Sequence, residues 1–171
     1  MTEIQESITG ETMTVGDKTY ALVQFHFHAP SEHTVDGEHF PMEMRFVHQP
    51  EGGALAVVGV LVEESIENAG IAPLWAQLAE APGNAVAIRI PVDFDEYVFT
   101  GDASSDYHYT GSLATPPCSE RVSRYIRKTP TGPSNEQIHE FKAVYDHNNR
   151  PVQALNERTL YLDASPDVTI D

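Results

Sequence analysis

The sequence is poor in cations, with 10 lysine and arginine residues against 26 aspartate and glutamate residues among 171. The formal charge of −16 repels a phosphate backbone, so we expect no nucleic-acid partner. Long apolar runs are also missing. The longest ones, such as residues 55–62, are far shorter than a membrane span, so we expect no membrane-spanning segment.

Cysteine is almost absent, because Cys118 stands alone and no disulfide can form within the chain. A reducing compartment fits this count, although a bridge to another chain stays possible. The first residues are acidic and polar and contain no apolar stretch typical of a secretory signal. The chain as it stands fits the cytoplasm, but its location stays open. We predict one domain over residues 1–171, since 40% hydrophobic residues suffice for a core.

Short strand-like runs dominate the sequence. Residues 20–28 alternate, which predicts a strand with Val23, Phe25 and Phe27 on one face and Gln24, His26 and His28 on the other. Further strands are expected at the following ranges: 40–48, 55–62, 85–92, 122–126 and a short run at 159–162. In the expected strand at 40–48, Glu43, Arg45 and Val47 share a face.

Two helices are expected among these strands. Residues 71–81 predict a short helix that ends at Pro82 and Gly83. Residues 134–147 give a clearer pattern, because Ser134 and Gln137 match a capping box before an apolar stripe. The stripe consists of Ile138, Phe141, Val144 and Tyr145. The expected fold class is therefore mainly β with minor helices.

His26 and His28 are the first candidate functional residues. Residues two apart on a strand project to the same face, which is how a sheet offers two imidazoles to one metal ion. A catalytic zinc site needs at least three protein ligands, so a neighbouring strand has to supply another one. Without it, the pair is more typical of two hydrogen-bonded histidines in a pocket that binds no metal.

Several segments together resemble the α-class carbonic anhydrases of bacterial type. The segments are QFHFHAPSEH at 24–33, EMRFVH at 43–48, LAVVGV at 55–60, GSLATPPCSE at 111–120 and NNRPVQ at 148–153. The resemblance covers the chain from about residue 14 onward and implies the α-carbonic-anhydrase fold. That fold is a large, twisted, mostly antiparallel sheet with short peripheral helices, and its N-terminal part is missing here. The solitude of Cys118 follows as well, because its partner in bacterial members lies in the missing part.

In that family three histidines hold a zinc ion, which lowers the pKa of a bound water so that hydroxide attacks carbon dioxide. The resemblance places the first two ligands at His26 and His28, and the third at Arg45. A guanidinium is always charged and offers no lone pair to a metal. We therefore expect zinc to be weakly bound or absent. Arg45 needs a carboxylate partner, and Glu43 and Glu32 are the candidates.

A second departure affects the family's hydroxide-orienting threonine, whose position is taken by Ala114. Without a hydroxyl group there, Glu32 loses its usual partner, while Thr115 keeps only a secondary role. Gln24, Glu43 and His33 correspond to residues that support the ligands. We interpret His33 and His48 as structural hydrogen-bonding histidines.

The third departure concerns the wall that receives carbon dioxide in the family. Val47, Val57, Leu113 and Val122 correspond to its apolar lining, but Arg124 stands where tryptophan is usual. Arg124 and Arg45 together suggest a pocket for a small anion. The alternative to an anion pocket is a strand with charged flanks and no ligand, since Arg121, Arg127 and Lys128 lie close by in the sequence.

These departures predict a carbonic-anhydrase-like protein that is catalytically inactive and acts as a binding or structural module. The alternative is a zinc-dependent carbonic anhydrase with a substitute ligand, such as Glu43 or a residue of another subunit. An excised piece of an active enzyme is a third reading. Because missing outer strands expose sheet edge, we also expect a homodimer or a partner chain that covers the gap.

Overall fold

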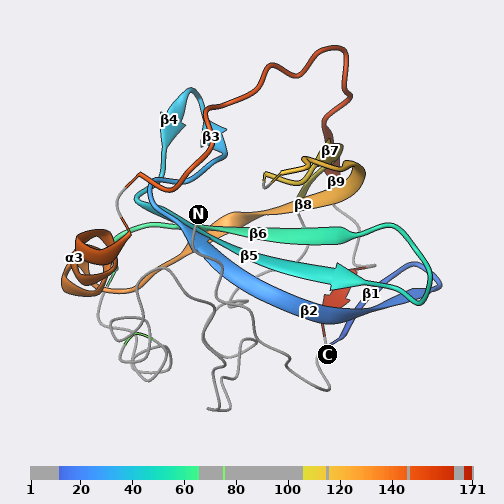
Figure 1. Ribbon diagram of the computed structural model, residues 1–171, viewed down its shortest axis with the longest axis horizontal. Coiled ribbons are helices and arrows are strands. Elements are labelled where there is room, and N and C mark those ends of the chain that lie inside the picture. Colours follow the sequence, from blue (N-terminus) through green and yellow to red (C-terminus); the bar gives the residue numbers. More distant parts are fainter. Residues whose placement is uncertain are drawn as a thin grey trace.

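The computed structural model describes residues 12–65, 75, 106–114, 116–145, 147–163 and 168–170. Within these residues most of the chain forms one curved sheet in the order β10-β1-β2-β5-β6-β8-β7-β9 (Figure 1). Its strands are β1 (Thr12–Val15), β2 (Lys18–His28), β5 (Met42–Gln49), β6 (Ala56–Val62), β7 (Asp106–Ser112), β8 (Glu120–Thr131), β9 (Tyr161–Asp163) and β10 (Val168–Ile170). A separate hairpin contains β3 (Thr34–Val35) and β4 (Glu38–His39).

The sheet is mixed but mostly antiparallel, as expected. Among the described strands only β6 and β8 pair in parallel, and every other neighbouring pair is antiparallel. β6 is apolar and buried at every position, which is typical of a central strand. Among the described helices none is long and apolar enough to cross a membrane. The mainly-β class predicted from the sequence is confirmed.

The predicted alternation along β2 is correct at its second half and wrong at Val23. A β-bulge lies between Leu22 and Gln24, so two residues of β2 face one residue of β5. The extra residue turns Val23 outward, where 43% of it is exposed, and Leu22 takes the inner place. Beyond the bulge, Phe25 and Phe27 point into the core as expected.

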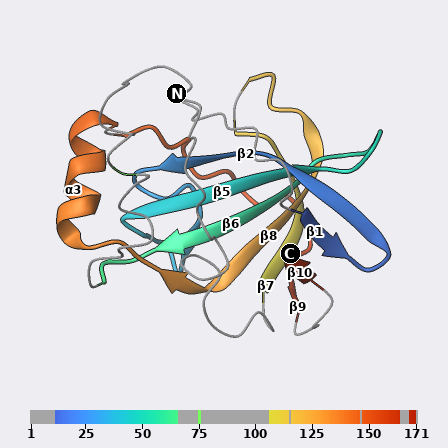
Figure 2. The same cartoon turned by 90° about the horizontal axis from the view of Figure 1, so that it is seen from below.

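The hydrophobic core covers one face of the sheet. Phe27 lies at its centre, with ring centroids 5.3 Å from Trp75 and 5.6 Å from Phe141. Phe46 stacks on Phe25 at 5.9 Å. The helix α3 (Asn135–Val144) stands at one end of the strands in Figures 1 and 2 and contributes Ile138 and Phe141 to the core.

The local signals that start α3 are confirmed. The Ser134 hydroxyl accepts a hydrogen bond from the Gln137 backbone N–H, and the Gln137 side chain accepts one from the Ser134 backbone N–H. This capping box satisfies two backbone donors at the start of the helix. Tyr145 is the C-cap, so the helix ends at Val144, three residues before the predicted limit. The predicted helix at 71–81, apart from the helical residue Trp75, and the predicted strand at 85–92 lie outside the described residues.

A long C-terminal segment crosses the other face of the sheet. Residues 147–160 run past the β3–β4 hairpin and reach β9 at the far side of the sheet (Figure 1). Asn148 fixes the start of this segment to the end of β2. Its side chain accepts a hydrogen bond from the Ala29 N–H at 2.8 Å and donates one to the Phe27 carbonyl at 3.0 Å.

Candidate functional site

The candidate site occupies the sheet face opposite the core, and its residues are placed by strand register. Arg45 of β5 lies directly between His26 of β2 and Gly59 of β6. Its neighbour along β5 on this face, Glu43, lies opposite His28. The predicted faces of β2 and β5 are therefore confirmed for these residues, and they bring the two imidazoles next to Arg45.

The two imidazoles are buried and neutral. His26 is 7% exposed and His28 is fully buried, and their ring centroids lie 5.0 Å apart. Burial and, after it, nearby positive charge hold both pKa values below the usual range. The His28 Nδ1 lies 3.2 Å from the Asn148 carbonyl oxygen, which can only accept, so Nδ1 donates. That tautomer leaves an unshared electron pair on the His28 Nε2, an atom with no hydrogen-bond partner among the described residues.

Arg45 is bound by two carboxylates. Its Nε donates to Glu43 Oε1 at 2.8 Å, and its Nη1 lies 2.5 Å from Glu32 Oε2. All three side chains are at least 93% buried. Burial on its own lowers the pKa of Arg45, but the charges of Glu43 and Glu32 outweigh it and the pKa is raised. Arg45 is thus a permanent cation whose charge is matched inside the protein, and both carboxylates predicted as its partners bind it.

Glu43 is the most heavily bonded group of the site. Besides the Arg45 bond, it accepts hydrogen bonds from the backbone N–H groups of Glu32 and His33, at 2.9 and 3.0 Å. The His33 Nδ1 donates to it at 2.7 Å, and the other ring nitrogen of His33 lies 2.7 Å from the Tyr109 hydroxyl. Burial raises the pKa of Glu43, but Arg45 and His33 together hold it well below the usual range. Four donors, two on each oxygen, therefore occupy the Glu43 carboxylate.

The absence of a side chain at Gly59 leaves room for the ion pair of Arg45 and Glu43. Gly59 faces the site, and a Cβ atom there would lie 3.0 Å from Glu43 Oε1 and 2.8 Å from Ile126 Cδ1. Both distances are tighter than ordinary contacts between packed atoms. The glycine in the LAVVGV segment thus leaves the space that the Glu43 carboxylate occupies.

Zinc, the metal that the resemblance implies, needs donors that these residues do not supply. His26 and His28 offer neutral imidazoles, but the side chain facing them from β5 is a cation without a lone pair. Glu43 and Glu32, the nearest carboxylates, are both held by Arg45. No group of three or more metal-ligating side chains occurs in the part of the chain that the structure describes. A zinc ion with three protein ligands does not fit these residues.

Glu32, predicted to lose its usual hydroxyl partner, is bound by other groups. Its Oε2 binds Arg45, and its Oε1 accepts a hydrogen bond from the Arg150 backbone N–H at 2.7 Å. The cation and the C-terminal segment therefore replace the hydroxyl that Ala114 does not have. Thr115 lies outside the described residues. His48 is structural as predicted, because its Nδ1 donates to the Phe46 carbonyl at 3.1 Å. The peptide bond before Pro117 is cis.

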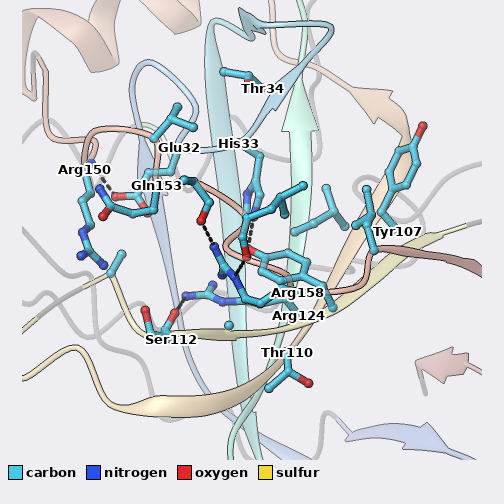
Figure 3. Close-up of a pocket in the computed structure, with 18 of the residues that line it drawn as sticks. Glu32, His33, Thr34, Tyr107, Thr110, Ser112, Arg124, Arg150, Gln153 and Arg158 are labelled. Carbon is cyan, nitrogen blue, oxygen red and sulfur yellow. Dashed lines mark hydrogen bonds between the residues drawn. The ribbon is translucent and has the colours of Figure 1, made fainter.

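The predicted apolar wall forms one cluster. Val47, Val57 and Val122 pack together in the interior with Leu113 against them. Arg124 lies directly opposite Val57 in the parallel pair of β6 and β8, so a cation does stand beside this cluster. The Arg124 Nη2 donates to the Ser112 carbonyl, a bond drawn as a dashed line in Figure 3. Gln24 is on the same face, and its Oε1 has no partner among the described residues.

A cavity of about 890 Å³ opens beside this cluster, between the sheet and the C-terminal segment (Figure 3). Arg45 and Arg124 both line it, together with Tyr109 of β7 and Arg150 and Arg158 of the segment. Neither Tyr109 nor these last two arginines was predicted to belong to the site. Their chain positions lie far from the histidines, and the sequence holds no local signal that places residues 150–158 over β7 and β8.

Comparison with protein families places the chain. Residues 1–164 match the family model described as eukaryotic-type carbonic anhydrase. Together with the fold and the position of the two imidazoles, this match shows that the chain belongs to the carbonic anhydrase family.

Curated relatives and solved structures agree with this placement. The chain is 39% identical over 153 residues to a carbonic anhydrase of Pectobacterium atrosepticum, which covers 89% of this chain and 62% of the relative. A carbonic anhydrase of Klebsiella pneumoniae is 40% identical, with 91% and 63% covered. The α-carbonic anhydrase of Photobacterium profundum superposes with a TM-score of 0.79 at 37% identity, with 89% of this chain and 70% of that chain covered. The chain thus spans about three-fifths of the length of these curated relatives.

Proposed function

We propose that this chain is a catalytically inactive member of the carbonic anhydrase family that acts as a binding or structural module. One observation supports the proposal above others: Arg45 stands opposite His26 with its charge matched by Glu43 and Glu32. A metal ion beside His26 and His28 would meet this cation where it needs a third donor. Two imidazoles alone hold zinc weakly.

The alternative, a zinc enzyme with Glu43 as the substitute ligand, has less support. Glu43 accepts four hydrogen bonds, and ligating a metal would require it to give up Arg45, which would then be buried with one carboxylate fewer. A substitute ligand from another subunit would likewise give near-stoichiometric zinc in the experiment below.

The experiment measures zinc content and carbon dioxide hydration of the purified protein after exposure to zinc. We expect substoichiometric zinc and no hydration that a sulfonamide inhibits. Near-stoichiometric zinc with inhibitable turnover in the unchanged protein would overturn the proposal.

Two variants make the test specific for Arg45. Arg45→His places a third imidazole opposite His26, with the Glu43 carboxylate nearby as an acceptor for its second ring nitrogen, and should gain zinc. Arg45→Gln removes the same charge but adds no imidazole, so it should not gain zinc. If both variants bind zinc equally, the missing ligand is not what limits the site. Adding Ala114→Thr to Arg45→His should raise metal content more readily than activity.

The homodimer or covering partner also stays a proposal. It is supported by exposed apolar side chains around β9: Leu155, Leu160, Tyr161 and Leu162 are each 48–57% exposed. Sedimentation that shows a stable monomer would count against it.

A further inference from the structure

Cationic side chains are concentrated at one cavity of an otherwise acidic protein. Five of the chain's 10 lysine and arginine residues line the cavity beside β7 and β8, whereas the whole chain has a formal charge of −16. They are Arg45, Arg121, Arg124, Arg150 and Arg158. The acidic lining residues are Glu32, Asp36 and Glu120, and Glu32 is already bound to Arg45. The cavity thus has an excess of positive charge.

Arg124 is a buried cation of this group that has no counter-charge among the described residues. It is 3% exposed, yet no carboxylate of the described residues lies within 4.0 Å of it. Its Nη2 donates to the Ser112 carbonyl, whereas its buried Nε has no acceptor among those residues. Burial and then the charge of Arg45 lower its pKa to about 10, so it is still charged at pH 7. A buried charge without a partner is costly, so an anion that supplied the partner would be bound favourably here.

Tyr109 and Arg158 complete the surroundings of Arg124. Tyr109 lies directly opposite Arg124 in the β7–β8 pair, and the Arg158 guanidinium carbon lies 5.6 Å from the centre of the Tyr109 ring. Arg158 donates to the Leu155 and Ala154 carbonyls, which are neutral, and no carboxylate of the described residues forms an ion pair with it. The lack of a side chain at Gly111 makes room for this arrangement, because a Cβ there would lie 2.8 Å from the Tyr109 ring and 3.3 Å from Arg124 Cγ.

We propose that this cavity binds a small organic acid whose carboxylate is held by Arg124 and Arg158 beside Tyr109. Arginine forks match carboxylates in geometry and charge. A cavity of about 890 Å³ also exceeds what an inorganic anion needs, and it is within the range for drug-sized ligands. The organic body of the ligand would lie against Tyr109 and the apolar part of the lining. Arg45 is not a ligand here, because Glu43 and Glu32 already match its charge.

The inference extends the proposed binding role, but it does not depend on the absence of catalysis. The test uses protein stripped of metal with a chelator and titrated with benzoate by calorimetry, with neutral benzamide and inorganic sulfate as comparison probes. We expect benzoate to bind more tightly than either. Arg124→Gln should weaken benzoate binding about tenfold or more, as loss of a charged hydrogen bond does.

Lys142→Gln is the matched control, because it removes one positive charge on α3, far from the cavity lining, and should leave benzoate binding unchanged. Arg124→Lys keeps the charge without the fork and should retain part of the affinity. Circular dichroism establishes that each variant is folded. Equal binding of benzamide and benzoate, equal binding of sulfate, or unchanged binding in Arg124→Gln would each overturn the inference. Zinc content and hydration decide the proposed function separately, so the two failures are distinguishable.

Discussion

The two faces of the sheet are built from alternate residues of the same strands, but they are held together by different forces. On β2 and β5, Phe25, Phe27 and Phe46 pack into an apolar core. Their immediate neighbours His26 and Arg45 form a buried polar layer on the other side. The core face is stabilised by the burial of apolar surface, whereas the site face depends on the pairing of each buried charge with an opposite charge. Substitutions on the two faces should therefore fail for different reasons.

The largest effect is expected on the core face. Phe27→Ala removes a ring that contacts Phe25, Trp75 and Phe141, and it leaves a cavity that these rings cannot fill. We expect the free energy of unfolding to fall by about 4 kcal/mol, measured by urea denaturation. A loss below about 1 kcal/mol would show that the core around α3 is loosely packed.

Arg45→Met tests the charge matching on the site face. The change leaves the buried Glu43 carboxylate without its cation, although two backbone N–H groups and His33 still donate to it. We expect a loss of about 3 kcal/mol in the free energy of unfolding. Arg121→Met, at an exposed cavity residue, should change it by less than about 0.5 kcal/mol.

A second variant separates the charge from the packing. Arg45→Met combined with Glu43→Gln removes one of the two buried carboxylates that lose their cation, so this double variant should be more stable than Arg45→Met alone. If the double variant is less stable than Arg45→Met, packing and hydrogen bonds rather than charge balance determine the stability of the polar layer.

The smallest of the three effects depends on pH. Burial lowers the pKa of His48 from 6.5 to about 4, so the folded protein resists a proton that the unfolded chain accepts. The stabilisation is present above the unfolded pKa of about 6.5 and is lost as the pH falls toward 4. Between pH 7 and pH 5 the loss from His48 should be about 2 kcal/mol.

His48→Asn removes this titration while keeping an N–H group near the Phe46 carbonyl. Because His26 and His28 also titrate at low pH, the measured quantity is the difference in unfolding free energy between this variant and the unchanged protein. That difference should shrink as the pH falls from 7 to 5. A constant difference would mean that His48 has the same pKa in the folded and the unfolded state.

Sequence reasoning succeeded where the determinants are local. The capping box at Ser134 and the paired faces of β2 and β5 follow from spacing alone, and the structure contains both. Val23 was misplaced because a bulge shifts the alternation by one residue, and no residue type in 20–28 marks it. The bulge is a property of the pairing between two strands rather than of one of them.

The site was predicted only as far as family motifs reach. Arg45 and both of its carboxylates were identified, because they stand within those motifs. The role of Arg158 was not, since it depends on a segment that runs over β7 from more than a hundred residues beyond the histidines. The position of such a segment is set by contacts like those of Asn148 with the end of β2, which link residues about 120 apart.

The ion pair of Arg45 with Glu43 and Glu32 gives the protein a built-in counter-ion. In a metalloprotein the buried carboxylates and imidazoles around the centre depend on an ion taken from the surroundings, and scarcity of that ion weakens the fold. Here the positive charge that pairs with Glu43 and Glu32 belongs to Arg45, a residue of the same chain. The charges of these three side chains therefore pair with one another on folding without an ion from solution.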